Sequence, residues 1–223
     1  MFDNQLRLKQ QAAQAALASI KLGCKLGVGS GSTVNAFIDA LSPLKHRFSG
    51  VVAASVQTEN YLKAIGFDVL DLNNMGSLDV YIDGADEVNQ ELQLIKGGGG
   101  ALTREKVIAS ASKQFICIAD QSKWVDWLGG CVLPIEVIPM ARSYVAREIV
   151  KLGGFSSYRL GYLTDNGNNI LDTQHWDFTA PQQLESLLNN IPGVVCNGLF
   201  AQRAADQLFL ATTQGVRVHT ARA

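Results

Sequence analysis

The sequence predicts an α/β protein: a Rossmann-like, mostly parallel sheet with helices on both faces, plus a small ferredoxin-like α+β domain inserted near the C-terminus. Up to residue 120, apolar strand-like segments alternate with helix-like segments, the order of a parallel sheet with crossover helices. After Gly129-Gly130 the order becomes β-α-β-β-α-β, the split βαβ pattern. We therefore expect a Rossmann-like domain at 1–130 and 206–223, and a second, ferredoxin-like domain at 131–205.

The elements of the first domain follow from periodicity and from glycine stops. Residues 4–21 are rich in Ala, Gln and Leu and end before Gly23, which is typical of a helix and its stop. The apolar residues of 32–41 fall on one helical face, and Gly66 ends a helix at 58–65. A further helix is expected at 101–112, and strands are expected at 25–29, 51–54, 68–72, 78–82, 92–95 and 114–119.

The second domain is marked by prolines and by one strong turn. Prolines at positions 134 and 139 predict that the strand at 132–138 lies at the edge of its sheet, because proline has no N–H to donate to a neighbouring strand. The run Asp165-Asn-Gly-Asn168 predicts a hairpin turn. The remaining elements are helices at 142–152 and 181–190, strands at 158–164, 169–172 and 194–199, and a final hairpin at 207–211 and 215–218 that returns to the first sheet.

Composition excludes several classes of protein. The 223 residues carry 19 Lys and Arg against 20 Asp and Glu, a net charge of −1, so nothing favours a nucleic-acid partner held by phosphate neutralisation. No apolar run approaches the ~20 residues of a membrane helix, and residues 1–14 lack a signal-peptide core. The four cysteines form no C-x-x-C pair and the three histidines have no metal-ligand spacing. We expect a cytoplasmic protein with neither a nucleic-acid nor a membrane partner.

The first candidate site is the glycine turn 27–33, between a strand and a helix. Backbone N–H groups and the helix dipole meet at such a point and favour an anion, and Ser30, Ser32 and Thr33 add hydroxyl groups. A dinucleotide motif would need Gly at position 32, and a P-loop would need Gly-Lys-Ser/Thr, so a single phosphate is the better ligand. The alternative is a tight turn with a capping serine.

The second candidate is Asp83-Gly84-Ala85-Asp86-Glu87, directly after an apolar strand. Carboxylates at the carboxyl end of a sheet strand lie where α/β folds bind ligands, and neighbouring carboxylates can divide acid and base roles. An acidic turn is the alternative, because Asp-Gly is ordinary turn chemistry. A metal is not favoured, since no further ligand set has suitable spacing.

The third and fourth candidates supply lysines. Lys96 precedes four glycines at 97–100, which cost chain entropy and let backbone amides approach a ligand, and Glu105 follows in the next helix. A solvated Lys96 and a helix-dipole role for Glu105 are the alternatives.

The fourth candidate is Lys123, which follows the strand at 114–119. It could complete an anion site, or it could be an exposed loop lysine. Because all four segments follow predicted strands, they could converge on one sheet edge and serve a phosphorylated polyol undergoing proton transfer.

These segments resemble the type A ribose-5-phosphate isomerases over nearly the whole chain and in family order. The family often has Thr at position 30 and Ala at position 100. The matching stretches are GVGSGSTVNAFIDAL (27–41), YIDGADEVN (81–89), IKGGGGALTREKVIAS (95–110), FICIADQSK (115–123), LPIEVIPMAR (133–142), VKLGG (150–154), TDNGN (164–168) and IPGVV (191–195).

The resemblance implies interconversion of D-ribose 5-phosphate and D-ribulose 5-phosphate through an enediolate, in the non-oxidative pentose phosphate pathway. It implies Glu105 as the general base, Asp83 and Asp86 for hydroxyl protons and ring opening, and Lys96 for charge stabilisation. It implies no cofactor and no metal. The family is usually dimeric or tetrameric, and with the apolar strand at 132–138 we expect a homodimer, the second domain serving as an oligomer contact or a lid on the catalytic domain. The substrate-binding residues that it implies are Ser30, Gly31, Ser32, Thr33, Asp83, Gly84, Ala85, Asp86, Lys96, Gly97, Gly98, Gly99 and Lys123.

Two other functions are compatible with glycine-rich strand ends. A non-catalytic sugar-phosphate sensor would need the phosphate contacts but no placed base, and the presence of Glu105, Asp83, Asp86 and Lys96 together argues against it. A CoA-transferase-like enzyme would use its glutamate as a nucleophile on a thioester.

Overall fold

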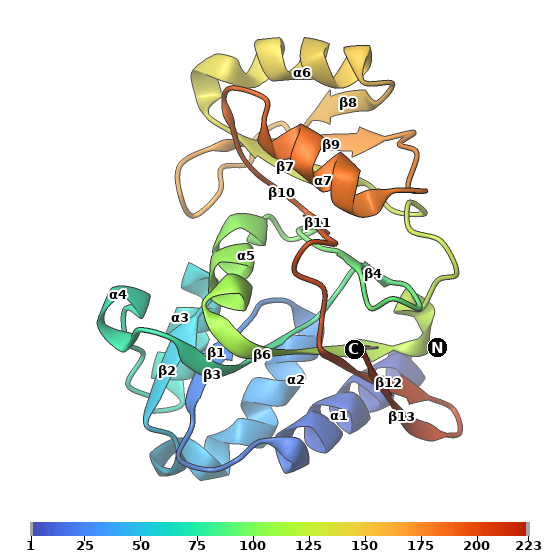
Figure 1. The fold of residues 1–223 in the computed structure, drawn as a ribbon. Helices are drawn as coiled ribbons and strands as arrows, with labels where there is room; N and C mark the ends of the chain where they lie inside the picture. Colours follow the sequence, from blue (N-terminus) through green and yellow to red (C-terminus); the bar gives the residue numbers. More distant parts are fainter. Residues whose placement is uncertain (1, 222–223) are drawn as a thin grey trace. The chain divides into compact units, whose positions relative to one another are not determined.

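The computed structural model describes residues 2–221 and divides them into two compact units (Figure 1). The first unit comprises residues 2–85, 104–124 and 205–221, and the second comprises residues 86–103 and 125–204. No helix in this part of the chain is long and apolar enough to cross a membrane.

The first unit is built on a sheet of six described strands in the order β13-β12-β6-β3-β1-β2. Every neighbouring pair is parallel except β12 with β13, which form the antiparallel C-terminal hairpin. This confirms the mostly parallel sheet. The strands are β1 (Lys25–Val28), β2 (Gly50–Ala53), β3 (Leu78–Asp83), β6 (Ser112–Asp120), β12 (Gln207–Thr212) and β13 (Gly215–Thr220).

Helices cover both faces of this sheet, as expected (Figure 1). On one face α1 and α2 pack against Leu26, Val28 and Ile82 in a core that excludes water. On the other face Gly27 lies against α5, where a Cβ at Gly27 would stand 2.7 Å from Ile108. The helices are α1 (Phe2–Ser19), α2 (Ser32–Leu41), η1 (Ser42–Arg47), α3 (Val56–Ala64), α4 (Leu72–Met75), α5 (Leu102–Ser110, whose residues 104–110 belong to this unit) and η2 (Gln121–Lys123).

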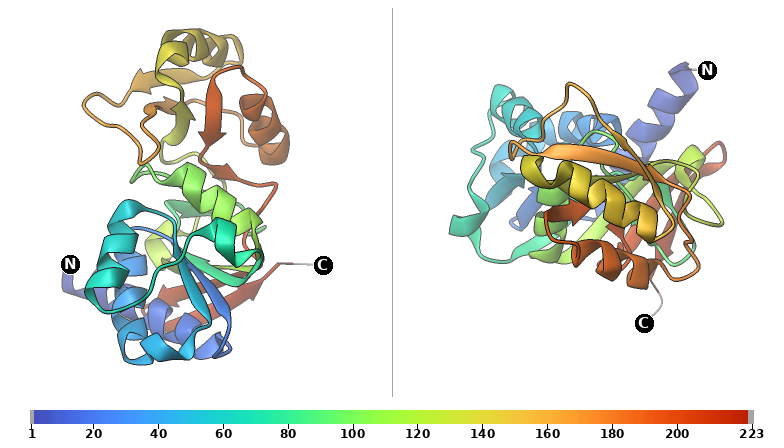
Figure 2. Two further views of the ribbon diagram at one scale, coloured as in Figure 1. Left: turned by 90° about the vertical axis from the view of Figure 1, so that its left-hand side faces the viewer. Right: turned by 90° about the horizontal axis from the view of Figure 1, so that it is seen from above.

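The second unit contains an antiparallel sheet in the order β10-β7-β9-β8, with two helices on one face (Figure 2). Val145 and Ile149 of one helix and Leu184 and Leu188 of the other share a core with Ile135 of the sheet. The order β-α-β-β-α-β confirms the ferredoxin-like domain. Its elements are β7 (Leu133–Val137), η3 (Pro139–Ala141), α6 (Arg142–Lys151), β8 (Phe155–Tyr158), β9 (Asn169–Gln174), α7 (Pro181–Asn189) and β10 (Val194–Asn197).

A small sheet in the same unit was not foreseen. Its order is β11-β5-β4, formed by β4 (Glu87–Val88), β5 (Leu94–Ile95) and β11 (Leu199–Phe200). This pairing joins 86–103 to the second unit, whereas the sequence analysis assigns it to the first domain. The strand expected at 92–95 is confirmed as β5, but β4 is only two residues long and carries no readable alternation, so the sequence pattern could not show it. The domain limits themselves stay a prediction.

The strand expected at 68–72 is wrong. Only Val69 forms an isolated bridge, to Val51, and the chain then enters α4. The carboxylate of Asp71 accepts a hydrogen bond from the backbone N–H of Asn73 at 2.7 Å and so caps this helix. Asp71, which the sequence analysis placed inside a strand, is therefore the N-cap residue of a helix.

The edge position expected for 132–138 is also wrong, because β7 is central and lies between β10 and β9. Pro134 is tolerated because β10 pairs only with the residues that follow it, so no ladder bond to that strand is lost. The first hairpin strand is Phe155–Tyr158 rather than 158–164. The predicted turn exists, and its Thr164 and Asn168 donate to the buried Glu136 carboxylate at 2.9 and 2.8 Å.

Candidate active site

The sheet of the first unit has a topological switch point at β1. The chain leaves β1 for its neighbour β2 on one side and later reaches β3 on the other side. In open α/β sheets, ligands bind at the carboxyl ends of the strands at such a point. The loop that follows β1 begins at Gly29, and Asp83 is the last residue of β3. Ser30 and Asp83 therefore stand where the fold favours a ligand.

Asp83 is completely buried, and both of its oxygens accept hydrogen bonds. Oδ1 accepts from the backbone N–H groups of Ser30 at 3.1 Å and Gly84 at 2.7 Å, and Oδ2 accepts from the phenol of Tyr81. A Cβ at Gly29 would lie 2.0 Å from the Asp83 carboxyl carbon, so this position needs glycine. These hydrogen bonds fix the orientation of the Asp83 carboxylate.

Tyr81 holds Asp83 from within the core, and the sequence analysis missed it. Its ring packs on Phe115 with the centroids 5.1 Å apart. Burial, followed by the nearby charges of Asp83 and Glu105, raises the pKa of the Tyr81 phenol well above its ordinary value. The phenol therefore stays protonated and serves as a permanent donor to Asp83. An apolar strand position gives no sign of such a role.

Glu105 lies in α5 and is buried. Its Oε1 accepts a hydrogen bond from the Ser30 hydroxyl at 2.6 Å. Ser30 therefore joins two carboxylates, since its N–H donates to Asp83 and its hydroxyl donates to Glu105. The sequence analysis assigned Ser30 to the substrate; in the structure its hydroxyl orients a carboxylate. The fold thus brings together three predicted residues from three separate segments.

The N-terminus of α2 carries the predicted anion site of the glycine turn. Gly31, at φ +92°, leads the chain into the helix, which begins at Ser32. The ammonium group of Lys9, on α1, donates to the Ser32 hydroxyl at 2.8 Å. Lys9 therefore adds a positive charge to the positive end of the helix dipole. The sequence analysis missed Lys9 because one lysine in a polar helix is indistinguishable from a surface charge.

The other predicted substrate-binding residues of the first unit also lie at the carboxyl ends of the sheet strands. Thr33 is the second residue of α2, and its Cβ lies 3.9 Å from the position that a Cβ at Gly84 would take. Gly84 and Ala85 follow β3 directly. Lys123 is half-buried and ends η2, directly after β6, the sheet neighbour of β3. Residues from the carboxyl ends of β1, β3 and β6 thus make up this group.

The second unit holds the remaining predicted residues. The carboxylate of Asp86 accepts a hydrogen bond from the N–H of Gly98 at 2.8 Å. A Cβ at Gly98 would stand 3.1 Å from both Asp86 oxygens, so the carboxylate lies close against the glycine. Lys96 is buried, with its ammonium nitrogen 5.6 Å from the centre of the Phe200 ring. Asp86 and Lys96 are thus fixed by the glycine segment and by its small sheet.

The glycine run 97–100 is an ordered turn within this unit. Gly97 and Gly100 have φ values of +94° and +85°, which favour glycine. The N–H of Gly100 donates to the carbonyl of Gly97 at 2.8 Å, and Gly99 lies between them. The run therefore has a fixed shape, and its role in binding a ligand stays a prediction.

The donor set of the two groups consists of carboxylates, hydroxyls, backbone amides and lysines. Within residues 2–221 no group of three or more His, Cys, Asp and Glu side chains is arranged to hold a metal ion. The chemistry available from the side chains themselves is proton transfer by carboxylates and stabilisation of anions.

Comparison with known proteins identifies relatives along nearly the whole chain. A family model described as ribose 5-phosphate isomerase A (phosphoriboisomerase A) matches residues 50–215. Curated ribose-5-phosphate isomerases A from Haemophilus ducreyi and Pasteurella multocida are 54% and 53% identical to this chain. Each match covers 96% of this chain, and 98% and 99% of the relatives respectively.

Solved structures agree with the sequence relatives. A crystal structure of ribose 5 phosphate isomerase A from Neisseria gonorrhoeae is 43% identical, with a TM-score of 0.95 over 98% of both chains. A D-ribose-5-phosphate isomerase in complex with phospho-erythronic acid is 36% identical, with a TM-score of 0.92 over 96% of this chain and 98% of the other. Sequence, fold and strand-end residues point to one group of enzymes, and this chain belongs to the ribose-5-phosphate isomerase A family.

Proposed function

We propose that the enzyme interconverts D-ribose 5-phosphate and D-ribulose 5-phosphate through an enediolate, with Glu105 as the general base, in the non-oxidative pentose phosphate pathway. One observation carries the proposal: Ser30 holds two buried carboxylates, Glu105 and Asp83, at the switch point of the sheet. A base that must remove a proton from carbon needs a fixed position, and this bridge supplies it.

The reaction needs the movement of two protons. Glu105 removes the proton from C2 of the open-chain aldose, and negative charge develops on the carbonyl oxygen at C1. The proton of the C2 hydroxyl then passes to the C1 oxygen. We assign this proton transfer, and the opening of the sugar ring, to Asp83 and Asp86. Glu105 then returns its proton to C1, which leaves a ketone at C2. The ammonium group of Lys96 stabilises the enediolate charge.

The phosphate is assigned to the N-terminus of α2. There Gly31, Ser32 and Thr33 offer backbone and hydroxyl donors, and Lys9 and Lys123 supply charge. The glycines 97–99 are assigned to the sugar. A structural relative was solved with phospho-erythronic acid, a phosphorylated sugar acid, which supports a ligand of this type. A metal-independent reaction, a homodimer and a cytoplasmic location complete the proposal.

The direct test is incubation of the purified enzyme with ribose 5-phosphate, with the appearance of ribulose 5-phosphate followed by NMR. We expect turnover to an equilibrium mixture of the two sugars. A sugar-phosphate sensor would bind ribose 5-phosphate without converting it, and a CoA-transferase would instead exchange CoA between a thioester and an acid. Either outcome would contradict the proposal.

A further inference from the structure

The glycine run 97–100 has no side chains, so only contacts to its N–H and C=O groups can hold it in place. On one side the N–H of Gly98 donates to Asp86. On the other side two residues of the segment that follows β8 donate to the carbonyl groups: Arg159 to Gly98 at 3.0 Å, and the Tyr162 hydroxyl to Gly99 at 2.8 Å. All of these residues lie in the second unit.

Arg159 is itself rigidly held. Its guanidinium donates through Nε to Asp172 Oδ2 at 2.8 Å and through a second nitrogen to Oδ1, a two-point ion pair with a carboxylate of β9. The side chains of Arg159 and Asp172 are only 18% and 22% exposed, so water screens this ion pair weakly. Because guanidinium is a planar fork, it can bind Asp172 along one edge and still direct a third N–H to Gly98. Lysine cannot reproduce this geometry.

Tyr162 fits against the run as closely as Arg159 does. A Cβ at Gly100 would lie 2.1 Å from the Tyr162 hydroxyl oxygen, so the ring occupies the space that any side chain at 100 would need. The Arg159 guanidinium stands 5.4 Å from the centre of the Tyr162 ring, within the range of a cation–π contact. Arg159, Tyr162 and Asp172 therefore form one connected clamp on the carbonyl side of the run.

The planarity of the peptide bond gives the clamp a directional effect. In a trans peptide the C=O of one residue and the N–H of the next point in opposite directions. When Arg159 fixes the carbonyl of Gly98, it also directs the N–H of Gly99 away from the guanidinium. The N–H of Gly98 is meanwhile committed to Asp86. The clamp thus sets the direction of an amide that we assign to the sugar and the position of a carboxylate that we assign to proton transfer.

We propose that Arg159 and Tyr162 are positioning residues of this isomerase: through the carbonyl groups of Gly98 and Gly99 they hold the glycine run, and with it Asp86, in the geometry that the reaction requires. This inference rests on the proposed function. The run adjoins Lys96, which we assign to the enediolate charge, and contacts Asp86, which we assign to the hydroxyl protons. Its displacement should therefore lower kcat more than it raises KM.

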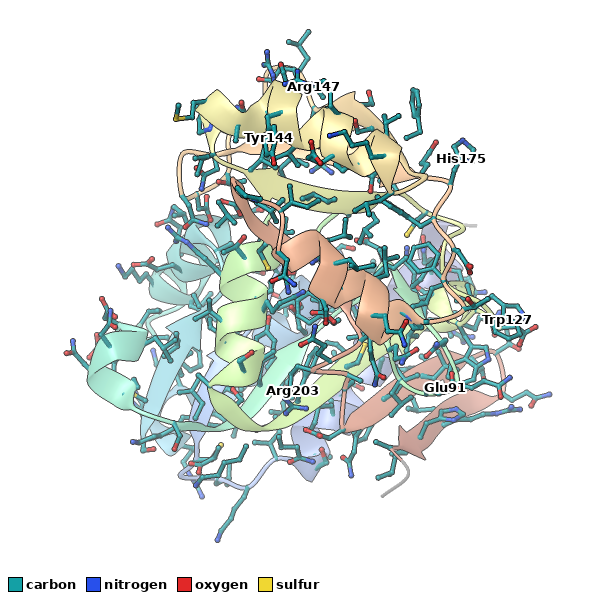
Figure 3. The ribbon with its side chains drawn as sticks, turned by 45° about the horizontal axis from the view of Figure 1, so that its top comes forward. Glu91, Trp127, Tyr144, Arg147, His175 and Arg203 are labelled. Atoms are coloured by element: carbon teal, nitrogen blue, oxygen red, sulfur yellow. The ribbon has the colours of Figure 1, made fainter. Side chains whose placement is uncertain are left out.

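The test uses Arg159→Met, Arg159→Lys and Tyr162→Phe, with Arg147→Met and Tyr144→Phe as matched controls. Both control residues project from α6, in the same unit (Figure 3). Hydrogen–deuterium exchange of the peptide that covers 96–101 reports on the run, and kcat and KM for ribose 5-phosphate report on catalysis. The Arg159 variants should exchange faster and lose ~10-fold in kcat, with a smaller change in KM, and Tyr162→Phe should follow with a smaller loss.

The controls should keep wild-type values in both measurements. Unchanged exchange in the Arg159 variants would overturn the clamp, and faster exchange with wild-type kcat and KM would overturn its role in catalysis. Full activity in Arg159→Lys would also overturn it, because charge alone would then suffice. If the wild-type enzyme converts no ribose 5-phosphate, the proposed function fails, and the exchange measurement still decides whether the clamp holds the run.

Discussion

Ser30 shows how much of the candidate site depends on single atoms. Its N–H and its hydroxyl connect Asp83 and Glu105, which lie 53 and 75 residues further along the chain. The sequence could mark these three residues because each follows a strand or glycine-rich segment. It could not show the bridge between them, since a contact over such a separation depends on the tertiary fold. Tyr81 and Arg159 were missed for the same reason.

Tyr81→Phe should change the stability of the enzyme in alkali. An unfolded tyrosine ionises near pH ~10, whereas burial and the charges of Asp83 and Glu105 raise the pKa of Tyr81 in the folded protein. Its contribution to the free energy of unfolding is therefore complete below pH ~10 and decreases as the pH rises further. In Tyr81→Phe this decrease should be smaller, by up to ~1.4 kcal/mol for each pH unit.

Urea unfolding at several values from about pH 9 to about pH 11 measures this difference. Tyr144→Phe is the control, because Tyr144 is exposed on α6 and should leave the pH dependence of the wild type unchanged. If Tyr81→Phe and the wild type show the same slope, the phenol does not stay protonated beside Asp83.

Gly100→Ala should lower the free energy of unfolding less when Tyr162 is also removed. The added Cβ would collide with the Tyr162 ring, and the φ of +85° adds strain of about 1 kcal/mol for any side chain. In a Tyr162→Ala background only the strain remains. A double-mutant cycle on the free energy of unfolding should therefore show that the two substitutions are strongly non-additive. Additive effects would mean that Tyr162 does not occupy this space.

At the scale of helices and strands, periodicity predicted most of the elements. The helix at 32–41 was predicted to the residue because its apolar face is complete. The pattern failed where pairing, rather than periodicity, decides the structure: β4 is two residues long, and β7 is central despite its proline. Likewise, the contact between Lys9 of α1 and Ser32 of α2 depends on how two helices pack.

Lys9→Met should weaken phosphate binding while leaving the chemistry intact. The ammonium group stands at the N-terminus of α2, where it would face the phosphate rather than the reacting carbons. We expect KM for ribose 5-phosphate to rise ~10-fold, inhibition by inorganic phosphate to weaken in parallel, and kcat to change less. Arg7→Met, an exposed position on the same helix, is the control and should behave as wild type. A fall in kcat at unchanged KM would contradict the assignment.

At the scale of the whole molecule, the predicted α/β class and the ferredoxin-like insertion are confirmed. The chain divides into units differently from the predicted domains, because 86–103 pairs with β11. The candidate residues divide in the same way: Ser30, Asp83, Glu105 and Lys123 belong to one unit, while Asp86, Lys96 and the glycine run belong to the other. The types of the elements in each unit follow from the sequence pattern; the central place of β7 and the long-range pairing of two-residue strands do not.

The proposed mechanism needs no divalent ion. Proton transfer by Glu105 and stabilisation by a lysine complete the reaction without a Lewis acid. Exhaustive dialysis against a chelator should therefore leave kcat and KM for ribose 5-phosphate unchanged, with metal analysis of the dialysed protein as the control. Loss of activity that a divalent ion restores would refute this part of the proposal.

The central claim is that Glu105 is the base, and Glu105→Gln tests it most directly. The substitution keeps the shape of the side chain and can still accept from Ser30, but it removes the carboxylate. With circular dichroism confirming the fold and the exposed Glu91→Gln as a control, kcat for ribose 5-phosphate should fall by ~10²–10⁴, the usual contribution of a general base. A Glu105→Gln enzyme within a few-fold of the wild type would contradict the account.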